Sequence, residues 1–507
     1  MPFYFPPPTQ PTFRHLANSF AADDAPDFDI LTDEHLQKAC DAEGVAFASG
    51  DDQIWSPVLT LWTFLWQVVS SSKSCVAAVA RAIAWRVALG LPPCSSNSGA
   101  YCKARAKLPE ALLSRLTRDV AHRLDLRAPD AWLWRDRHVR VIDGTTATAA
   151  DTPANQEVYP QRDNLPGGVG FPLVRWVALF SLATAACIDL AIGPYSGKGA
   201  GETTLGRRIL ANLKPGDVLL GDRLFATYWL IAEVLTYQAD GVFRLHAHRD
   251  REGRRGASRL ERRQGLRDNV LVWTKPKRPE WMEQADYDAM PTELRVRVVW
   301  YRIETPGFRV REITLVTTLL DAKQYLPEEL ALLYRERWDV ELNMRTIKQT
   351  MKMEHLTSKC PEMLRKELWA HLLGYNLIRS VQARAALEHG KTPGGLSFAG
   401  AMHHLQEMRE LLTHTQGADR QVVLSALWEA ISKHPIGDRP NRIEPRQVKR
   451  GPKAYTKLRV PRRQAIQALL RAAEAADAAD AAAALEEFVV ASATAAAEEL
   501  AGAMPSN

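Results

Sequence analysis

The spacing of apolar residues changes twice along the chain, near residue 138 and again near residue 327. Residues 1–30 are rich in Pro and Phe and predict an irregular arm. From 31 to 130 apolar residues recur at helical spacing, and 58–68 is apolar enough for a buried helix. This part predicts a small helical DNA-binding domain, and it fits a helical domain with a purely packing role equally well.

Between 138 and 247 short apolar segments of strand type alternate with amphipathic segments of helical type. The predicted strands are 138–144, 217–222 and 241–247, together with a hairpin over 174–194 that turns near Thr184 to Ala186. The predicted helices are 201–213 and 223–238. This order predicts the α/β class, with a mixed sheet covered by helices on its faces.

After residue 247 the sequence becomes charged and alternating, and from Pro327 it becomes helical again. The Ala-rich tail predicts a weakly specified helix or partial disorder. The predicted domains are an irregular arm at 1–30, a helical domain at 31–130, a catalytic domain at 131–247 and 312–385, a β-rich insertion at 248–311, and a helical C-terminal region with a basic segment at 386–507.

The composition is that of an ordinary globular protein, with 46% hydrophobic and 24% charged residues. The net charge of +6 is small, but the basic residues are clustered. Seven arginines lie in 249–263, and nine Lys or Arg lie in 442–463. Such runs can bind DNA phosphates, and they can equally be solvated loops.

The cysteines and the apolar runs exclude several classes of protein. None of the six cysteines forms a C-x-x-C pair, so neither a zinc site nor a disulfide framework is predicted. No apolar run approaches the roughly 18 residues of a membrane helix, and the first residues lack the pattern of a signal peptide. We therefore expect a protein of the reducing cytoplasm.

The helix predicted after Pro327 carries one glutamate among cationic and phenolic side chains. Tyr334, Arg337, Glu341 and Lys348 are spaced by 3, 4 and 7 residues, which places them on one helical face, and Arg345 follows Glu341 by one turn. A carboxylate can ligate a hard metal ion while its neighbours hold phosphate oxygens. The alternative is a solvated charged face of an amphipathic helix.

Two aspartates stand at the ends of predicted strands. Asp143 follows VRVI, and Asp222 ends DVLLGD. Carboxylates at the carboxyl ends of strands lie where α/β folds build their sites, although either aspartate could simply cap a turn. Two such aspartates followed by a helical glutamate form the set that two-metal phosphoryl transfer requires.

The same residues resemble a known family. Tyr334-x2-Arg337-x3-Glu341-x6-Lys348 is similar to the Y-R-E-K signature of bacterial DDE transposases of the insertion-sequence-four family. VIDGTT at Asp143 and GDRLF at Asp222 resemble the aspartate motifs of that family. The segments 166–180 and 445–462 are also similar to members, so the resemblance spans about 138–463.

This resemblance implies an RNase H-like core interrupted by a β-rich insertion. It implies that Asp143, Asp222 and Glu341 ligate two Mg²⁺ ions, with Mn²⁺ as a substitute. It also implies that Tyr334, Arg337 and Lys348 hold DNA phosphates, and Arg345 is a further candidate for that role.

The implied reaction is cleavage at transposon ends followed by joining of the freed 3′-hydroxyl to target DNA, through a hairpin in some members. A tryptophan of the insertion stacks on a flipped base in such enzymes, and Trp273 and Trp300 are the candidates, with core packing as the alternative. The implied partners are terminal inverted repeats, target DNA and a second copy of the chain. Two other readings stay open, a DNA-binding relic without activity and a nuclease that cuts without joining.

Overall fold

The structure is a computed structural model, and it describes residues 30–45, 47, 54–70, 72–88, 90–163, 170–197, 199–246, 258–302, 312–415, 417–436, 464 and 466–479. Within these ranges only the backbone is described at 33, 88, 338–341, 409–410 and 413–414. Almost all of the predicted arm, the arginines of 249–257, the segment 439–463 and much of the Ala-rich tail lie outside the described residues.

Contacts divide the chain into two compact units. The first comprises Met1–Val299 and Thr314–Ile436, and the second comprises Trp300–Ile313 and Gly437–Asn507. In the second unit residues 466–479 are helical, and Arg302 forms an ion pair with Asp477 at 2.8 Å. Asp143, Asp222 and Glu341 all lie in the first unit.

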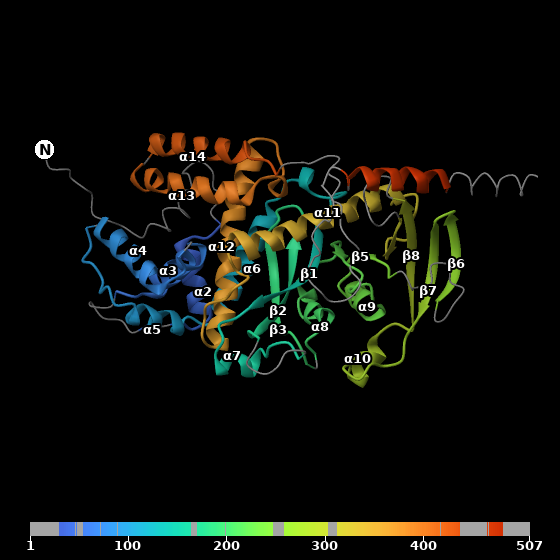
Figure 1. Cartoon of the computed structure of the whole chain (residues 1–507), viewed down its shortest axis with the longest axis horizontal. Helices are drawn as coiled ribbons and strands as arrows, with labels where there is room; N and C mark the ends of the chain where they lie inside the picture. The colour runs from blue at the N-terminus through green and yellow to red at the C-terminus, as the bar shows by residue number, and fades with distance from the viewer. Residues whose placement is uncertain are drawn as a thin grey trace, which may run out of the picture. The chain divides into compact units, whose positions relative to one another are not determined.

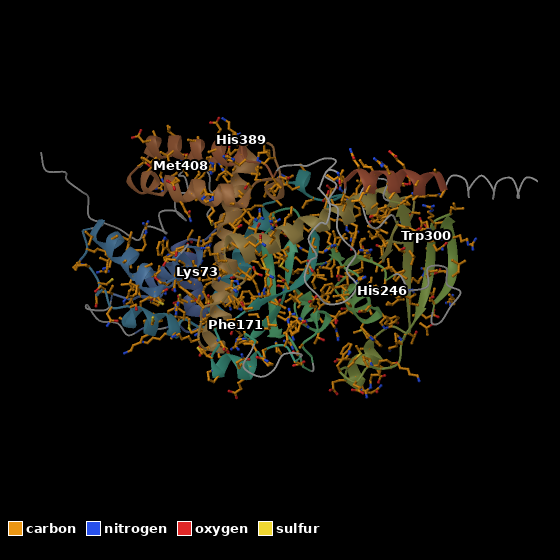
Figure 2. The ribbon with its side chains drawn as sticks, viewed as in Figure 1. Lys73, Phe171, His246, Trp300, His389 and Met408 are labelled. Atoms are coloured by element: carbon orange, nitrogen blue, oxygen red, sulfur yellow. The ribbon has the colours of Figure 1, made fainter. Side chains whose placement is uncertain are left out.

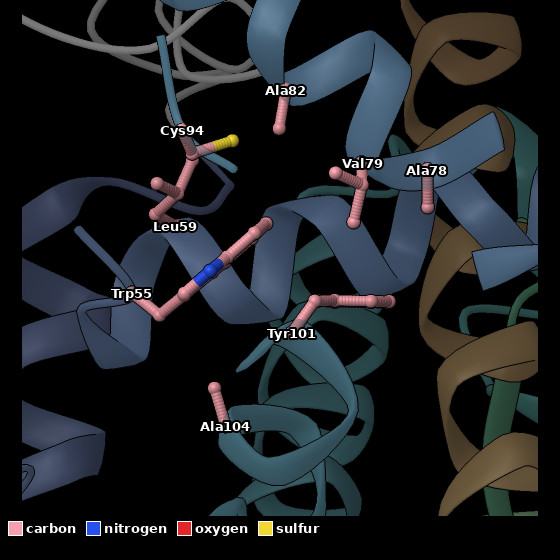
Figure 3. Packing of buried hydrophobic residues seen from close by; sticks show 8 residues of the cluster. All are labelled: Trp55, Leu59, Ala78, Val79, Ala82, Cys94, Tyr101 and Ala104. Carbon is pink, nitrogen blue, oxygen red and sulfur yellow. The ribbon is translucent and has the colours of Figure 1, made fainter. Parts of the chain in front are cut away.

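The first helices of the chain form the helical region predicted at 31–130. They are α2 (Asp33–Ala42), α3 (Pro57–Val69), α4 (Cys75–Ala88), α5 (Gly99–Lys107) and α6 (Glu110–Leu126). The buried helix predicted at 58–68 is confirmed by α3, whose first turn is capped by Ser56. Figure 3 shows the core beneath α3, where Trp55 and Tyr101 meet with ring centroids 5.1 Å apart.

A nine-stranded sheet forms the centre of the first unit (Figure 1), in the order β3-β2-β1-β4-β5-β9-β8-β7-β6. Its first part consists of β1 (Val139–Thr148), β2 (Leu173–Ser181), β3 (Cys187–Pro194), β4 (Val218–Gly221) and β5 (Asp240–Arg244). The strand β2 is antiparallel to β1 and β3, whereas β4 is parallel to β1 and β5. This arrangement is the RNase H-like core, and it confirms the predicted α/β class.

The helices associated with these strands differ from the prediction in their bounds. They are α7 (Pro153–Val158), α8 (Glu202–Arg207), α9 (Tyr228–Thr236) and α11 (Pro327–Arg345). The helix predicted at 201–213 is shorter, and a separate turn follows at Leu210–Asn212. The helix predicted to begin at 223 begins at 228, because Asp222 starts a turn that runs to Phe225. The hairpin predicted at 174–194 is confirmed by the pairing of β2 with β3.

The segment 248–311 contains the predicted strands, but these continue the central sheet. Its described elements are β6 (Ser258–Gly265), β7 (Asp268–Thr274), α10 (Gln284–Ala289) and β8 (Glu293–Arg302), and β9 (Glu312–Thr317) follows. The strand β9 pairs antiparallel with β5, which joins β8, β7 and β6 to the RNase H-like strands. The core is thus widened by added strands.

The long helix α12 (Pro361–Glu388) connects the helical region to the sheet (Figure 1). Arg365 pairs with Glu110 of α6 at 2.7 Å, and the Asn376 amide donates to the carbonyls of Thr117 and Cys187. Two further helices, α13 (Phe398–His414) and α14 (Gly417–Ser432), pack beside α12.

Lys73, labelled in Figure 2, also reaches α12, because its Nζ lies 2.9 Å from Nε2 of His371. Burial lowers the pKa of Lys73 to about 8 and that of His371 to about 4. At neutral pH the His371 imidazole is therefore neutral, while the Lys73 ammonium stays largely protonated and can donate to it. All six cysteines are free thiols. Within the described part of the chain, no helix combines the length and apolarity that crossing a membrane requires.

Candidate active site

The strands β1 and β4 bring the two predicted aspartates together. Their parallel register runs from Val139↔Val218 to Ile142↔Gly221, and the next residue in each chain is Asp143 or Asp222. Neighbouring strands are about 4.8 Å apart, so the two carboxylates belong to adjacent positions at the carboxyl end of β4. The sequence order suggested that the two aspartates act together, and the register of β1 and β4 explains why they are neighbours.

Each aspartate also makes the local contact expected of a turn residue. The Gly144 N–H donates to Oδ1 of Asp143 at 2.9 Å, and the Leu224 N–H donates to Oδ1 of Asp222 at 2.8 Å.

The predicted end of the first strand was wrong, because β1 continues beyond residue 144 to Thr148 through its pairing with β2. Asp143 therefore lies within a strand, where its backbone pairs with Ala178 of β2.

The helix α11 places Tyr334 and Arg337 at the aspartates. Tyr334 is 3% exposed and Arg337 is 7% exposed. The alternative interpretation, a charged helical face in contact with solvent, therefore does not apply to these two residues. Arg337 Nη1 lies 3.9 Å from Asp143 Oδ2, and its guanidinium lies 5.7 Å from the Tyr334 ring centroid. Burial raises the pKa of Tyr334 to about 12, with the cation Arg337 opposing and the charge of Asp222 adding to the shift. The phenol therefore remains a hydrogen-bond donor.

Glu341 lies on α11 one helical turn beyond Arg337, and its side chain is outside the described residues. Lys348 is not in the α-helix, because 346–350 form a π-helical turn. Its Nζ donates to Oγ1 of Thr145 at 3.2 Å, two residues along β1 from Asp143. The ammonium group thus reaches the neighbourhood of the aspartates.

Three other predicted residues are placed differently. Arg345 is exposed, and its Nε donates to Oε1 of Gln349 at 2.8 Å on the surface of the helix. Trp273 of β7 is only 5% exposed, which favours the core-packing interpretation. Trp300 is half-buried near the end of β8 (Figure 2). The exposed tryptophan of the described insertion is instead Trp281, at 45%, with the Arg207 guanidinium 4.3 Å from its ring centroid.

A carboxylate that sequence reasoning missed lies on the opposite face of β1, at the residue after Asp143. Glu202, the first residue of α8, lies against Gly144, and its Oε1 is 3.8 Å from Nε of Arg175 on β2. Burial raises the pKa of Glu202; the charge of Arg175 opposes the shift and that of Asp222 adds to it. The available signal was a glutamate at a helix start between the two aspartate motifs, but the sequence gives no reason to distinguish it from any helix-start acid.

The donor chemistry fits a hard divalent cation. Carboxylate oxygens are the ligands that Mg²⁺ prefers, and Asp143 and Asp222 supply them at adjacent positions. Among the residues whose side chains are described, no three of the His, Cys, Asp or Glu type are grouped closely enough to hold a metal ion. A third ligand from Glu341 would complete such a group.

Comparison with known proteins shows which family this fold is similar to. Residues 134–377 match the family described as Transposase DDE domain. That match includes both aspartates and all of α11. Residues 134–377 thus correspond to a transposase DDE domain on an RNase H-like core, which indicates a DNA-cleaving and strand-transferring enzyme.

The chain is similar to a member of the insertion-sequence-four family of these enzymes. It is 28% identical over 332 residues to "Transposase InsG for insertion sequence element IS4" of Escherichia coli (strain K12), covering 64% of this chain and 70% of that protein. A solved piggyBac transposase synaptic complex with hairpin DNA is similar at 11% identity and a TM-score of 0.38, over 80% of this chain and 84% of that one.

Proposed function

We propose that this transposase cleaves phosphodiester bonds at the ends of its element and joins the freed 3′-hydroxyl to target DNA, by cut and paste. The observation that carries the proposal is the β1–β4 register that sets Asp143 beside Asp222, with Arg337 3.9 Å from the first of them. Carboxylates and a guanidinium at one point are the groups that phosphoryl transfer uses.

Asp143, Asp222 and Glu341 would hold two Mg²⁺ ions, for which Mn²⁺ would substitute. Such ions, when bound, activate the attacking oxygen and stabilise the leaving oxygen of an in-line displacement. Before they bind, the Arg337 guanidinium compensates part of the charge of Asp143. This ion pair would keep the carboxylate in place for its ligand.

The cations and the phenol around the aspartates would position the DNA. Lys348, held at Thr145, would contact a phosphate on one side of the scissile bond, and Arg337 would contact the scissile phosphate itself. Tyr334, protonated across the physiological range, would donate a hydrogen bond to a phosphate oxygen. Arg345 and the two tryptophans have no placement that supports a comparable role.

The substrate would be double-stranded DNA with the terminal inverted repeats of the element, and a homodimer would hold two ends together. Such repeats should flank the coding region. The enzyme would act in the bacterial cytoplasm at the nucleoid. Two routes are compatible with cleavage of the second strand, direct hydrolysis and a hairpin on the transposon end.

The test is nicking of a labelled duplex that carries the flanking repeats. Asp143→Asn keeps the side-chain shape, and we expect it to abolish Mg²⁺-dependent nicking while DNA binding in a gel-shift assay is retained. Asp130→Asn is the matched control, because Asp130 is an exposed aspartate outside the site. Unchanged nicking by Asp143→Asn would refute the assignment.

The products separate the remaining alternatives. Joined products that carry the labelled 3′ end on a target duplex distinguish a transposase from a nuclease. A hairpin appears on a denaturing gel as a single strand of twice the length. A native chain that binds the repeats but cuts them with neither Mg²⁺ nor Mn²⁺ would favour an inactive DNA-binding protein.

A further inference from the structure

The turn that carries Lys348 is closed by its own backbone. Three N–H groups within 351–354 donate to the carbonyls of 346–348, at 3.1 to 3.2 Å. On the β1 side this turn is held by Thr148, whose N–H donates to the Glu354 carbonyl at 2.9 Å. Lys348 therefore takes its position from the whole turn and from whatever holds the turn in place.

On the other side the turn is held by a lysine of the helical region. Lys73 Nζ donates to the Lys352 carbonyl at 2.8 Å and lies 2.9 Å from Nε2 of His371 (Figure 2). The Nδ1 of His371 lies 2.8 Å from the Glu367 carbonyl. A carbonyl can only accept, so Nδ1 carries the imidazole proton and Nε2 accepts from Lys73. The ammonium group thus joins α12 and the turn at one point.

The backbone of Lys73 is itself fixed to the helices α3 and α5. Its N–H donates to Oγ of Ser70 at 3.2 Å, and its carbonyl accepts from the Gln67 amide at 2.8 Å. The Oε1 of Gln67 accepts in turn from the Tyr101 hydroxyl at 2.7 Å and from the Arg105 guanidinium at 2.8 Å. A continuous set of hydrogen bonds therefore leads from α5 to the ammonium group of Lys73.

Both residues of the contact have a backbone conformation that is unusual for lysine. The φ angle is +53° at Lys73 and +53° at Lys352. This left-handed region costs a residue with a Cβ atom roughly 1–2 kcal/mol, and glycine would avoid that cost. A glycine at position 73 would also remove the side chain that reaches the turn. The surrounding contacts thus hold both backbones in a conformation that lysine alone does not favour.

We propose that Lys73 is a positioning residue of the reaction, which fixes the segment 346–354 and thereby holds Lys348 beside the two aspartates. The inference rests on the proposed function, since it deepens the same site. Lys348 Nζ donates to Oγ1 of Thr145 at 3.2 Å, and Thr145 shares the strand face of Asp143 because the two lie two residues apart. A displacement of about 1 Å in such a site can lower a rate about a hundredfold, so a support outside the site affects the chemistry.

A second buried lysine provides a matched control. Lys366 of α12 is 2% exposed, and its Nζ donates to the Ala106 carbonyl of α5 at 2.9 Å. Its other partner is Glu362 on its own helix. Lys366 thus also joins α12 to the helical region through a backbone carbonyl, but it does so at α5 and not at the turn 346–354. Removing it tests the stability of that junction alone.

The experiment compares nicking rates at saturating DNA and Mg²⁺ with DNA affinity from a gel-shift assay. Lys73→Met should lower the rate about tenfold and leave the affinity unchanged, because Lys348 is displaced but not removed. Lys366→Met should lower the melting temperature and leave the rate unchanged. Equal losses of rate in the two variants would overturn the proposal. If Lys73→Met does not fold, Lys73→Gln replaces it, since its amide nitrogen stops one atom short of the ammonium position.

A double-variant comparison shows whether Lys73 acts through Lys348. In a chain that already carries Lys348→Met, adding Lys73→Met should lower the rate by less than about twofold, because both changes act on one group. A further tenfold loss in that background would mean that Lys73 acts elsewhere, and would overturn the proposal.

Hydrogen exchange tests the support of the turn without any need for activity. The amides of 351–354 should exchange about tenfold faster in Lys73→Met and at the native rate in Lys366→Met. Unchanged exchange and unchanged nicking in Lys73→Met, with nicking abolished in Asp143→Asn, would overturn the role of Lys73 and leave the proposed function standing. A native chain that nicks no duplex carrying the repeats would overturn both.

Discussion

The two halves of the sheet differ in direction, burial and charge. The inner half, β3-β2-β1-β4-β5, contains the parallel neighbours β1, β4 and β5, and its residues are largely buried. In the outer half, β9-β8-β7-β6, the pairings of β6 and β8 with β7 are antiparallel, and the last strand is exposed along most of its length. Parallel strands end side by side, which is why the aspartates meet in the inner half. The antiparallel strands of the outer half do not end side by side in this way, and the exposed strand β6 adds to the protein surface.

Each half also contains a buried arginine, and the two are held differently. Arg140 of β1 lies between Asp125 at 2.7 Å and Asp217 at 3.0 Å. Burial opposes ionisation of Asp125, but the hydrogen bond of His138 and the charge of Arg140 hold the pKa of Asp125 well below its usual range. Arg297 of β8 makes a two-pronged contact with one carboxylate, Asp268, at 2.8 Å and 2.6 Å, and its Nη1 donates to the Tyr325 carbonyl at 2.7 Å. The buried arginine of the outer half therefore has a single ion pair, whereas that of the inner half lies between two aspartates.

The largest expected effect comes from breaking that single pair. Arg297→Met leaves the Asp268 carboxylate buried without its cation, which should cost about 3–5 kcal/mol. Hydrogen exchange should show amides of β7 and β8 opening more readily by that amount, while amides of β1 and β4 change much less. The double variant Arg297→Met with Asp268→Leu should recover part of the loss. Equal loss of protection in both halves would show that the sheet opens as one unit, against the comparison.

The inner half could be predicted from the sequence more fully than the outer half, for physical reasons. The apolar runs before Asp143 and Asp222, and the spacing of Tyr334 and Arg337, are local signals that survive in the fold. The end of β1 was missed because GTTAT breaks the apolar pattern, whereas pairing with β2 carries the strand through it. A local pattern cannot report a partner that is far away in sequence.

The same limit explains what was missed elsewhere. The joining of β9 to β5 is a long-range pairing, so the insertion looked separate from the sheet. Glu202 and Gly144 meet only in the tertiary fold, and their contact depends on the absence of a side chain. Lys348 reaches Thr145 from a π-helical turn, which residue spacing alone does not reveal.

The second prediction separates a cation of the inner half from one of the outer half. Lys348→Met should lower the rate of nicking about a hundredfold, because removing one positioned donor to a reacting group costs roughly that much. Arg295→Met, on β8 of the outer half, removes a cation that pairs with Glu261 at 2.6 Å on the surface. At saturating DNA its nicking rate should equal that of the native enzyme. A comparable loss in both variants would remove the distinction between the halves.

The third prediction concerns the exposed strand β6. Arg262 and Arg263 are exposed there, and β6 is five strand positions from β4. At about 4.8 Å per strand this is roughly 24 Å, or about seven base pairs of duplex. The double change Arg262→Glu with Arg263→Glu should weaken DNA binding about tenfold and flatten its salt dependence.

The matched control for β6 is Lys433→Glu, an exposed cation at the end of α14 with 69% of its side chain accessible. It should leave DNA affinity unchanged. Ethylation of phosphates about seven base pairs from the cleavage site should weaken binding of the native enzyme and have no effect on the β6 variant. Equal sensitivity of both proteins would mean that β6 does not contact this part of the DNA.

The smallest effect is expected at Tyr334, whose ring stays in place when only its hydroxyl is removed. Tyr334→Phe should lower the nicking rate roughly fivefold, the value of about one hydrogen bond. Because the folded-state pKa of Tyr334 is raised to about 12, the phenol is protonated throughout the usual pH range. The pH–rate curve of the variant should therefore run parallel to that of the native enzyme below pH 11.

The raised pKa of Tyr334 also affects the stability of the fold. Tyr334 lowers the free energy of unfolding only as pH rises from about 10 toward 12, where the unfolded chain ionises first. Phenylalanine should remove that alkaline loss, and a native pH–rate curve with an alkaline limb below pH 10 that disappears in Tyr334→Phe would contradict a permanently protonated donor.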